Sequence, residues 1–231
     1  MKSTDDLYIL YTSGTTGAPK GIVRDHGGTA VGLNYGMKEV MNVHENDVHF
    51  AVSDIGWIVG HSFIVYGPLI RGCTTVFFEG KPIVPNAGVL WRICQQYKVS
   101  SIFMAPTAVR VIKKEDYEGD YCKEFDVSTV KTFGMAGERC DPDTVHWINK
   151  NLPKTNINDT WWQTETGWPQ TGNMLNRSKF GTIFPTLPGS VTKAVPGYNI
   201  KIFDEESNEE VGPNILGKVV IEMPMPPGFM S

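Results

Sequence analysis

The sequence predicts an α/β protein: parallel-sheet layers with flanking helices, followed by the start of a small β-rich subdomain. Short apolar runs bounded by turn residues alternate with segments of helical length. Proline stands at the expected helix starts, and the segment after residue 188 alternates between apolar and polar residues. Because such sheets bind ligands at the carboxyl ends of their strands, we expect the functional residues just after the strands.

Several apolar runs are predicted to be buried strands. They are residues 7–12, 48–52, 74–78, 101–104 and 130–135. Helices of roughly ten residues are expected between them. Proline suits the first turn of a helix, so we predict that helices begin at Pro106 and Pro142, with Asp141 capping the second one.

The residue pattern of the chain changes near residue 189. Residues 197–204 and 217–222 alternate like antiparallel strands, and the acidic turn 204–210 separates them. We therefore divide the chain into an α/β core, residues 1–188, and an incomplete β-rich subdomain, residues 189–231. The second part is called incomplete because two or three strands seldom bury enough surface to be stable alone.

The composition of the 231 residues is globular, with 41% hydrophobic and 20% charged residues. A net charge of -4, with scattered basic residues, favours neither nucleic acid nor a membrane surface as a partner. The most apolar stretch, 55–70, is shorter than the roughly 20 residues that a membrane span needs. The start of the chain carries no targeting pattern, and nothing in the sequence indicates an oligomeric state.

Cysteine spacing bears on the compartment. Cys73, Cys94, Cys122 and Cys140 form no C-x-x-C pair, so neither a zinc site nor a disulfide framework is expected. A reducing compartment follows, which means the cytoplasm or the mitochondrial matrix.

The strongest chemical signal is residues 11–21, Tyr-Thr-Ser-Gly-Thr-Thr-Gly-Ala-Pro-Lys-Gly, directly after a predicted strand. Glycines let the backbone approach an anion, hydroxyls donate hydrogen bonds to phosphate oxygens, and Lys20 adds a point charge. An ordinary Gly/Ser/Thr turn is the structural alternative. A Walker A loop does not match, because two residues separate Gly17 from Lys20 and glycine follows the lysine.

Three further strings carry a chemical signal, and the first two of them follow predicted strands. Residues 53–62 read Ser-Asp-Ile-Gly-Trp-Ile-Val-Gly-His-Ser, residues 136–139 Ala-Gly-Glu-Arg, and residues 159–167 Asp-Thr-Trp-Trp-Gln-Thr-Glu-Thr-Gly. Taken singly, each has a structural interpretation, since tryptophan and lone histidine usually serve packing and a turn Glu–Arg pair is usually solvated.

In this order, the four strings resemble the motifs of AMP-forming acyl-CoA synthetases in the adenylate-forming superfamily. The adjacent Trp161 and Trp162 resemble the short-chain branch, the acetyl- and propionyl-CoA synthetases. Arg139 replaces a proline and Val59 a threonine that are common in the acetyl type, so the chain resembles propionyl-type members more closely. The resemblance extends over nearly the whole chain.

The resemblance implies roles for individual residues, with ATP, Mg²⁺ and CoA as cofactor and co-substrates. The implied ATP and AMP contacts are Thr12, Ser13, Gly14, Thr15, Thr16, Gly17, Lys20, Gly137, Glu138, Arg139, Asp159, Thr160, Trp161, Trp162, Gln163 and Thr164. The implied acyl pocket is Trp57, Val59, Ala136 and Trp162, with Trp162 limiting the acid to a few carbons. Lys20, Thr164 and Glu165 are the implied catalytic residues, and Glu165 is the metal ligand. Val59 would also lie beside CoA, without the hydroxyl that threonine offers.

The implied reaction is that of an acid–thiol ligase. Such an enzyme activates propionate or acetate with ATP to an acyl-adenylate and passes the acyl group to CoA, releasing AMP and pyrophosphate. The family's ribose-binding aspartate and its C-terminal domain with a catalytic lysine are expected outside these residues, so we expect weak nucleotide binding and little or no turnover by this chain alone. Another adenylate-forming enzyme, or a non-catalytic, truncated nucleotide-binding homologue, remains the alternative.

Overall fold

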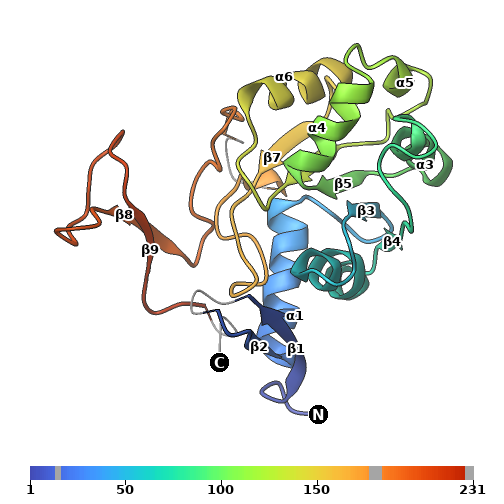
Figure 1. Cartoon of the computed structure of the whole chain (residues 1–231). Helices are drawn as coiled ribbons and strands as arrows, with labels where there is room; N and C mark the ends of the chain where they lie inside the picture. The colour runs from blue at the N-terminus through green and yellow to red at the C-terminus, as the bar shows by residue number, and fades with distance from the viewer. Residues whose placement is uncertain (14–16, 177–183, 227–231) are drawn as a thin grey trace.

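A five-stranded parallel sheet forms the centre of the protein in the computed structural model, which describes residues 1–13, 17–176 and 184–226 (Figure 1). The strand order is β4-β3-β5-β6-β7. The bounds are β3 Val48–Val52, β4 Thr74–Val76, β5 Ser101–Met104, β6 Thr132–Met135 and β7 Asn156–Asp159. The predicted α/β class with a largely parallel sheet is confirmed.

The strand order reverses between β3 and β5. The chain steps from β3 outward to β4, returns past β3 to β5, and then continues through β6 to β7 on the other side. In register, Val52 pairs with Met104, Met104 with Met135, and Met135 with Asp159, so the carboxyl ends of four strands lie side by side. A reversal of this kind opens a crevice at that edge of the sheet.

Two hydrophobic cores form because successive side chains of a strand point to opposite faces of the sheet. On one face, Phe50 and Ile102 pack in a cluster with Leu90, Val109 and Ile148. The last three side chains come from α3 Val89–Tyr97, α4 Pro106–Glu115 and α6 Pro142–Asn151, in that order. The short α5 Asp120–Lys123 adds Cys122 to the same cluster. These helices lie together on one side of the sheet in Figure 1.

The second core lies on the other face, where Ala51 and Phe103 join Leu33, Phe63 and Trp162. The covering elements are α1 His26–Tyr35, α2 Gly67–Arg71 and two π-helical segments, η1 Gly36–Val40 and η2 Gly60–Tyr66. The site described below therefore sits above a sheet that is packed on both faces.

Both predicted helix starts are confirmed. Pro106 opens α4 and Pro142 opens α6. The Oδ1 atom of Asp141 accepts a hydrogen bond from the backbone N–H of Thr144 at 2.9 Å, which satisfies one of the donors left free at a helix start.

The predicted first strand is present, but the expectation that it is buried is wrong. It is β1 Asp6–Thr12, which pairs antiparallel with β2 Lys20–Asp25 in a separate two-stranded sheet. Ile9 and Tyr11 are 55% and 69% exposed. The reason is local, because β1 pairs with β2, its neighbour in the sequence, and not with a strand of the parallel sheet.

Two other strands of the parallel sheet are shorter than predicted, and β2 and β7 were not predicted at all. β4 ends at Val76 and β6 begins at Thr132. β7 has the polar sequence Asn-Ile-Asn-Asp, but its Asn158 is satisfied by long-range hydrogen bonds. The Nδ2 atom of Asn158 donates to the carbonyls of Val40 and Asn173, both at 2.9 Å. These bonds allow a polar side chain to be buried in a strand that lacks an apolar run.

The predicted antiparallel pair after residue 189 is confirmed as β8 Asn199–Phe203 and β9 Lys218–Glu222. It projects to one side of the parallel sheet in Figure 1. The division at residue 188 stays a prediction.

All four cysteines are free and buried. Among the residues that the structure describes, no helix combines the length and the apolar character needed to cross a membrane.

Candidate active site

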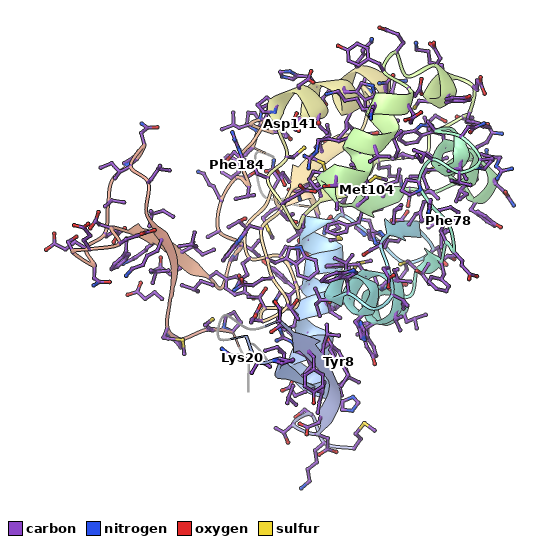
Figure 2. The ribbon with its side chains drawn as sticks, in the orientation of Figure 1. Tyr8, Lys20, Phe78, Met104, Asp141 and Phe184 are labelled. Carbon is purple, nitrogen blue, oxygen red and sulfur yellow. The ribbon has the colours of Figure 1, made fainter. Side chains whose placement is uncertain are left out.

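A cavity of about 930 Å³ opens at the carboxyl ends of β3, β5 and β6, where the strand order reverses. Segments far apart in the sequence line it: the end of β1, residues 52–59, the start of α4, residues 136–137 and residues 162–165. Met104, labelled in Figure 2, is the last residue of β5 at this edge. The structure thus brings parts of all four strings of the sequence together around one space.

One end of the cavity is aromatic. The ring centroids of Phe63 and Trp162 lie 5.2 Å apart in an edge-on arrangement, and Phe103 is 6.3 Å from Trp162. Gly134 makes room for Phe103, because a Cβ atom at this glycine would lie 2.6 Å from the Phe103 ring. Trp162 and Phe103 line the cavity together with Val59 and Ala136, so this end is apolar.

The other end is polar. Thr12, Ser13, Thr164 and Glu165 line it with hydroxyl and carboxylate groups. Hydroxyls and backbone N–H groups suit phosphate oxygens, and a carboxylate suits a hard cation.

The turn that carries Thr164 is held from several sides. The Nη2 atom of Arg24 donates to the Thr164 carbonyl at 2.7 Å, and the Ser62 hydroxyl donates to the Gly167 carbonyl at 2.7 Å. The Thr166 hydroxyl donates to the Gln163 carbonyl at 2.9 Å. Gly167 has φ +82°, a conformation that side chains rarely adopt.

Residues 137–139 face different directions. Gly137 lines the cavity with φ +99°, which again suits glycine. The Glu138 carboxylate accepts from the Thr107 N–H at 2.7 Å and pairs with Arg110, so it joins this loop to the start of α4. Burial acts to raise the pKa of Glu138, but the hydrogen bonds from Thr107 and Arg110 outweigh burial and lower it. Arg139 lies against Gly189.

Asp159 ends β7 and is 2% exposed. Burial raises the pKa of its carboxyl to about 6, and the nearby amides of Cys140 and Thr160 offset only part of the rise. The Thr160 N–H donates instead to the Met135 carbonyl, and the carboxylate finds no hydrogen-bond partner among the described residues. An unsatisfied buried carboxylate is a candidate acceptor for a ligand, although Asp159 itself does not line the cavity.

The structure sorts the predicted site residues into three groups. Those that line the cavity are Thr12, Ser13, Trp57, Val59, Ala136, Gly137, Trp162, Gln163, Thr164 and Glu165. Those that are described but do not line it are Gly17, Lys20, Glu138, Arg139, Asp159, Thr160 and Trp161. Gly14, Thr15 and Thr16 lie outside the described residues. Lys20 is exposed at the start of β2, and Figure 2 shows it on the β1–β2 hairpin with Tyr8. The roles of all these residues stay predictions.

Sequence reasoning missed part of the lining. Phe103, Ala105, Thr107 and Val111 line the cavity. Ala105 and Thr107 follow a predicted strand directly, so the rule for parallel sheets could have found them. Phe103 carries no local signal of its own, because only packing across the sheet places it under Trp162.

Comparison with known proteins identifies the family. Residues 1–228 match the family described as AMP-binding enzyme. The chain belongs to the AMP-binding enzyme family. Among its relatives, an uncharacterised protein of Pseudomonas aeruginosa is 47% identical over 99% of this chain and 36% of its own length.

Two relatives have informative names. The human "Acyl-CoA synthetase short-chain family member 3, mitochondrial" is 44% identical, and the alignment covers 99% of this chain and 33% of that protein. The Escherichia coli "Propionate--CoA ligase" is 42% identical over 100% of this chain and 36% of its own length. The chain spans about a third of the length of the curated relatives it matches.

Proposed function

We propose that this chain carries the nucleotide and acyl site of an AMP-forming acyl-CoA ligase that activates a short carboxylic acid, propionate or acetate. The observation that carries the proposal is one cavity whose lining combines packed aromatic side chains with hydroxyl and carboxylate groups. An acyl-adenylate has the same two parts, a small apolar tail and a phosphate. The names of the human and Escherichia coli relatives support the same reaction.

In this proposal, the apolar end selects the acid by size. Trp162 packs against Phe63 and Phe103, so it would form a fixed part of the pocket wall, which Val59 also lines. One methylene is worth only about 1–3 kcal/mol in such a pocket, so acetate and propionate are expected to differ modestly.

At the polar end, the hydroxyls of Thr12, Ser13 and Thr164 would donate to phosphate oxygens, and Lys20 would add positive charge. Magnesium fits this set, because Mg²⁺ bound to phosphates needs only one or two protein carboxylates and Glu165 lines the cavity here. When bound, the metal supplies charge neutralisation on the phosphates. Asp159, unsatisfied in the structure, would accept from the nucleotide.

The chemistry then follows from positioning. The carboxylate oxygen of the acid attacks the α-phosphorus of ATP, and pyrophosphate leaves. The thiol sulfur of CoA next attacks the acyl carbon of the adenylate, and AMP leaves. Trp57 and Val59 would lie beside the incoming thiol, and holding the reactants in line supplies much of the rate.

For the compartment, we propose the cytoplasm or the mitochondrial matrix. Four free cysteines support a reducing environment, and the human relative is named as mitochondrial.

Binding of alkyl esters of AMP to this chain tests the proposal, because such esters resemble an acyl-adenylate but do not react. Titration calorimetry should show that propyl-AMP binds at least tenfold more tightly than octyl-AMP. Trp162→Gly should remove most of that preference, whereas Trp91→Phe, a change in the buried core away from the cavity, should leave it intact. Failure of the chain to bind any alkyl-AMP, or equal affinity for both esters, would overturn the proposal.

A further inference from the structure

Arg24 is an arginine with 1% of its side chain exposed, in the short strand β2. Burial of a guanidinium costs free energy unless hydrogen bonds and opposite charge compensate it. A buried arginine therefore indicates a set of partners that need it. None of the four strings of the sequence includes Arg24, and it does not line the cavity.

The contacts of Arg24 converge on a single turn. Its Nη2 atom donates to the Thr164 carbonyl at 2.7 Å. Its guanidinium carbon lies 5.6 Å from the centroid of the Trp168 ring, and a Cβ atom at Gly167 would lie 3.3 Å from the same carbon. The guanidinium thus contacts the turn at three residues: Thr164 near its beginning, Gly167, and Trp168 at its end.

The first of these contacts fixes a particular peptide group. The carbonyl of Thr164 belongs to the peptide that joins Thr164 to Glu165, and both side chains line the cavity. Because a peptide group is planar, holding its oxygen on one side sets the orientation of both neighbouring residues. The Ser62 hydroxyl, at the Gly167 carbonyl, holds the far end of the turn in the same way.

The charge of Arg24 also acts on the site. Burial lowers the pKa of the Arg24 guanidinium, while the nearby Tyr8, Tyr198 and Glu165 raise it. Arginine keeps its proton under all ordinary conditions, so a permanent cation lies behind the turn, within electrostatic reach of Glu165. Trp168, which faces this cation, donates from Nε1 to the Tyr198 hydroxyl at 2.6 Å.

We propose that Arg24 is a positioning residue for the nucleotide site: it holds the peptide between Thr164 and Glu165 so that both side chains face the cavity. This inference rests on the proposed function of the site. Lysine can donate one hydrogen bond to the Thr164 carbonyl but lacks the planar fork that also stacks on Trp168, so the two cations are not equivalent here.

The test compares Arg24→Met and Arg24→Lys with a matched control, Arg71→Met. Arg71 also donates to a backbone carbonyl, that of Val43 at 3.1 Å, but it does not line the cavity. Amide hydrogen exchange of residues 161–170 is measured without ligand, and the affinity for Mg-ATP is measured by calorimetry. The amides of Thr166 and Gly167, which donate to the Gln163 carbonyl, report on the turn.

We expect Arg24→Met to speed exchange in residues 161–170 at least tenfold and to weaken Mg-ATP binding at least tenfold. Arg24→Lys should recover part of both losses, and Arg71→Met should change neither by more than twofold. Exchange in this segment that stays at the wild-type rate in Arg24→Met overturns the inference, as does Mg-ATP affinity that stays within twofold of wild type.

Two further outcomes are decisive. If the wild-type chain binds no Mg-ATP, the proposed function fails, while the exchange of residues 161–170 still supports or overturns the structural role of Arg24. If Arg24→Met does not fold, Arg24→Lys decides. Faster exchange confined to this segment in the folded lysine variant supports the inference, and wild-type exchange overturns it.

Discussion

Gly134→Ala probes the packing that supports the aromatic end of the cavity. Gly134 lies in the middle of β6, where an added Cβ would stand 2.6 Å from Cδ2 and 3.2 Å from Cε2 of Phe103. Carbon atoms in contact normally lie about 3.5–4.0 Å apart, so the ring must move by roughly 1 Å. Phe63 and Trp162 already pack against that ring and leave it little room.

The expected cost combines two terms of opposite sign. Overpacking a core costs about 1–3 kcal/mol, whereas replacing glycine by alanine stabilises the folded state by about 0.4–1 kcal/mol through the unfolded chain. We therefore expect Gly134→Ala to lower the free energy of unfolding by roughly 1–2 kcal/mol. Urea denaturation followed by tryptophan fluorescence measures this change.

Two controls isolate the clash. Gly212→Ala adds a Cβ with no atom within 4 Å, so stability should be unchanged or slightly higher. Gly134→Ala combined with Phe103→Leu replaces the ring by a smaller side chain, and the double variant should lose less stability than the two single changes together. Wild-type stability in Gly134→Ala, or strictly additive losses in the double variant, would refute the packing argument.

Three further changes test the electrostatics and the helix cap. Burial lowers the pKa of His49 to about 4 against the opposing charge of Asp47. The unfolded chain therefore binds the proton first, and stability falls by about 3 kcal/mol from pH 6.5 to pH 4. His49→Gln should flatten that part of the melting temperature profile, and an unchanged profile would contradict it. The raised pKa of Asp159, about 6, acts in the opposite direction: stability falls as the pH rises from about 4 through 6, because the buried carboxyl must then ionise in the folded state. Asp159→Asn should thus raise the free energy of unfolding by up to about 3 kcal/mol at pH 8 and by little at pH 4, measured by urea denaturation at both values; equal effects at the two would count against it. Asp141→Ala removes the cap at the start of α6 and should cost about 1 kcal/mol in the same assay, and no loss would show that the cap is dispensable.

The Asp159 prediction also concerns function. A carboxylate that destabilises the folded chain when nothing is bound is the kind of group that a ligand would satisfy. Under the proposed function, Asp159→Asn would therefore give a more stable chain with a changed affinity for nucleotide. The two effects are separable, since stability is measured without ligand.

Features that depend on neighbours in the chain could be predicted from the residues alone. Pro106, Pro142 and Asp141 act within one helical turn, and both helices begin where these residues stand. The apolar runs of β3 and β5 were also placed correctly. The four strings identified the family because their residue types and order are specific.

Features that join distant residues became visible in the folded structure. Polar β7 belongs to the sheet because Asn158 bonds to Val40 and Asn173, which local propensity cannot reveal. Arg24 and Thr164 are 140 positions apart, so no spacing rule connects them. Local conformational preferences act over a few residues, whereas burial and hydrogen bonding depend on what the fold brings near. The sequence therefore identified the motif residues, and the packed structure selected the residues that hold them in place.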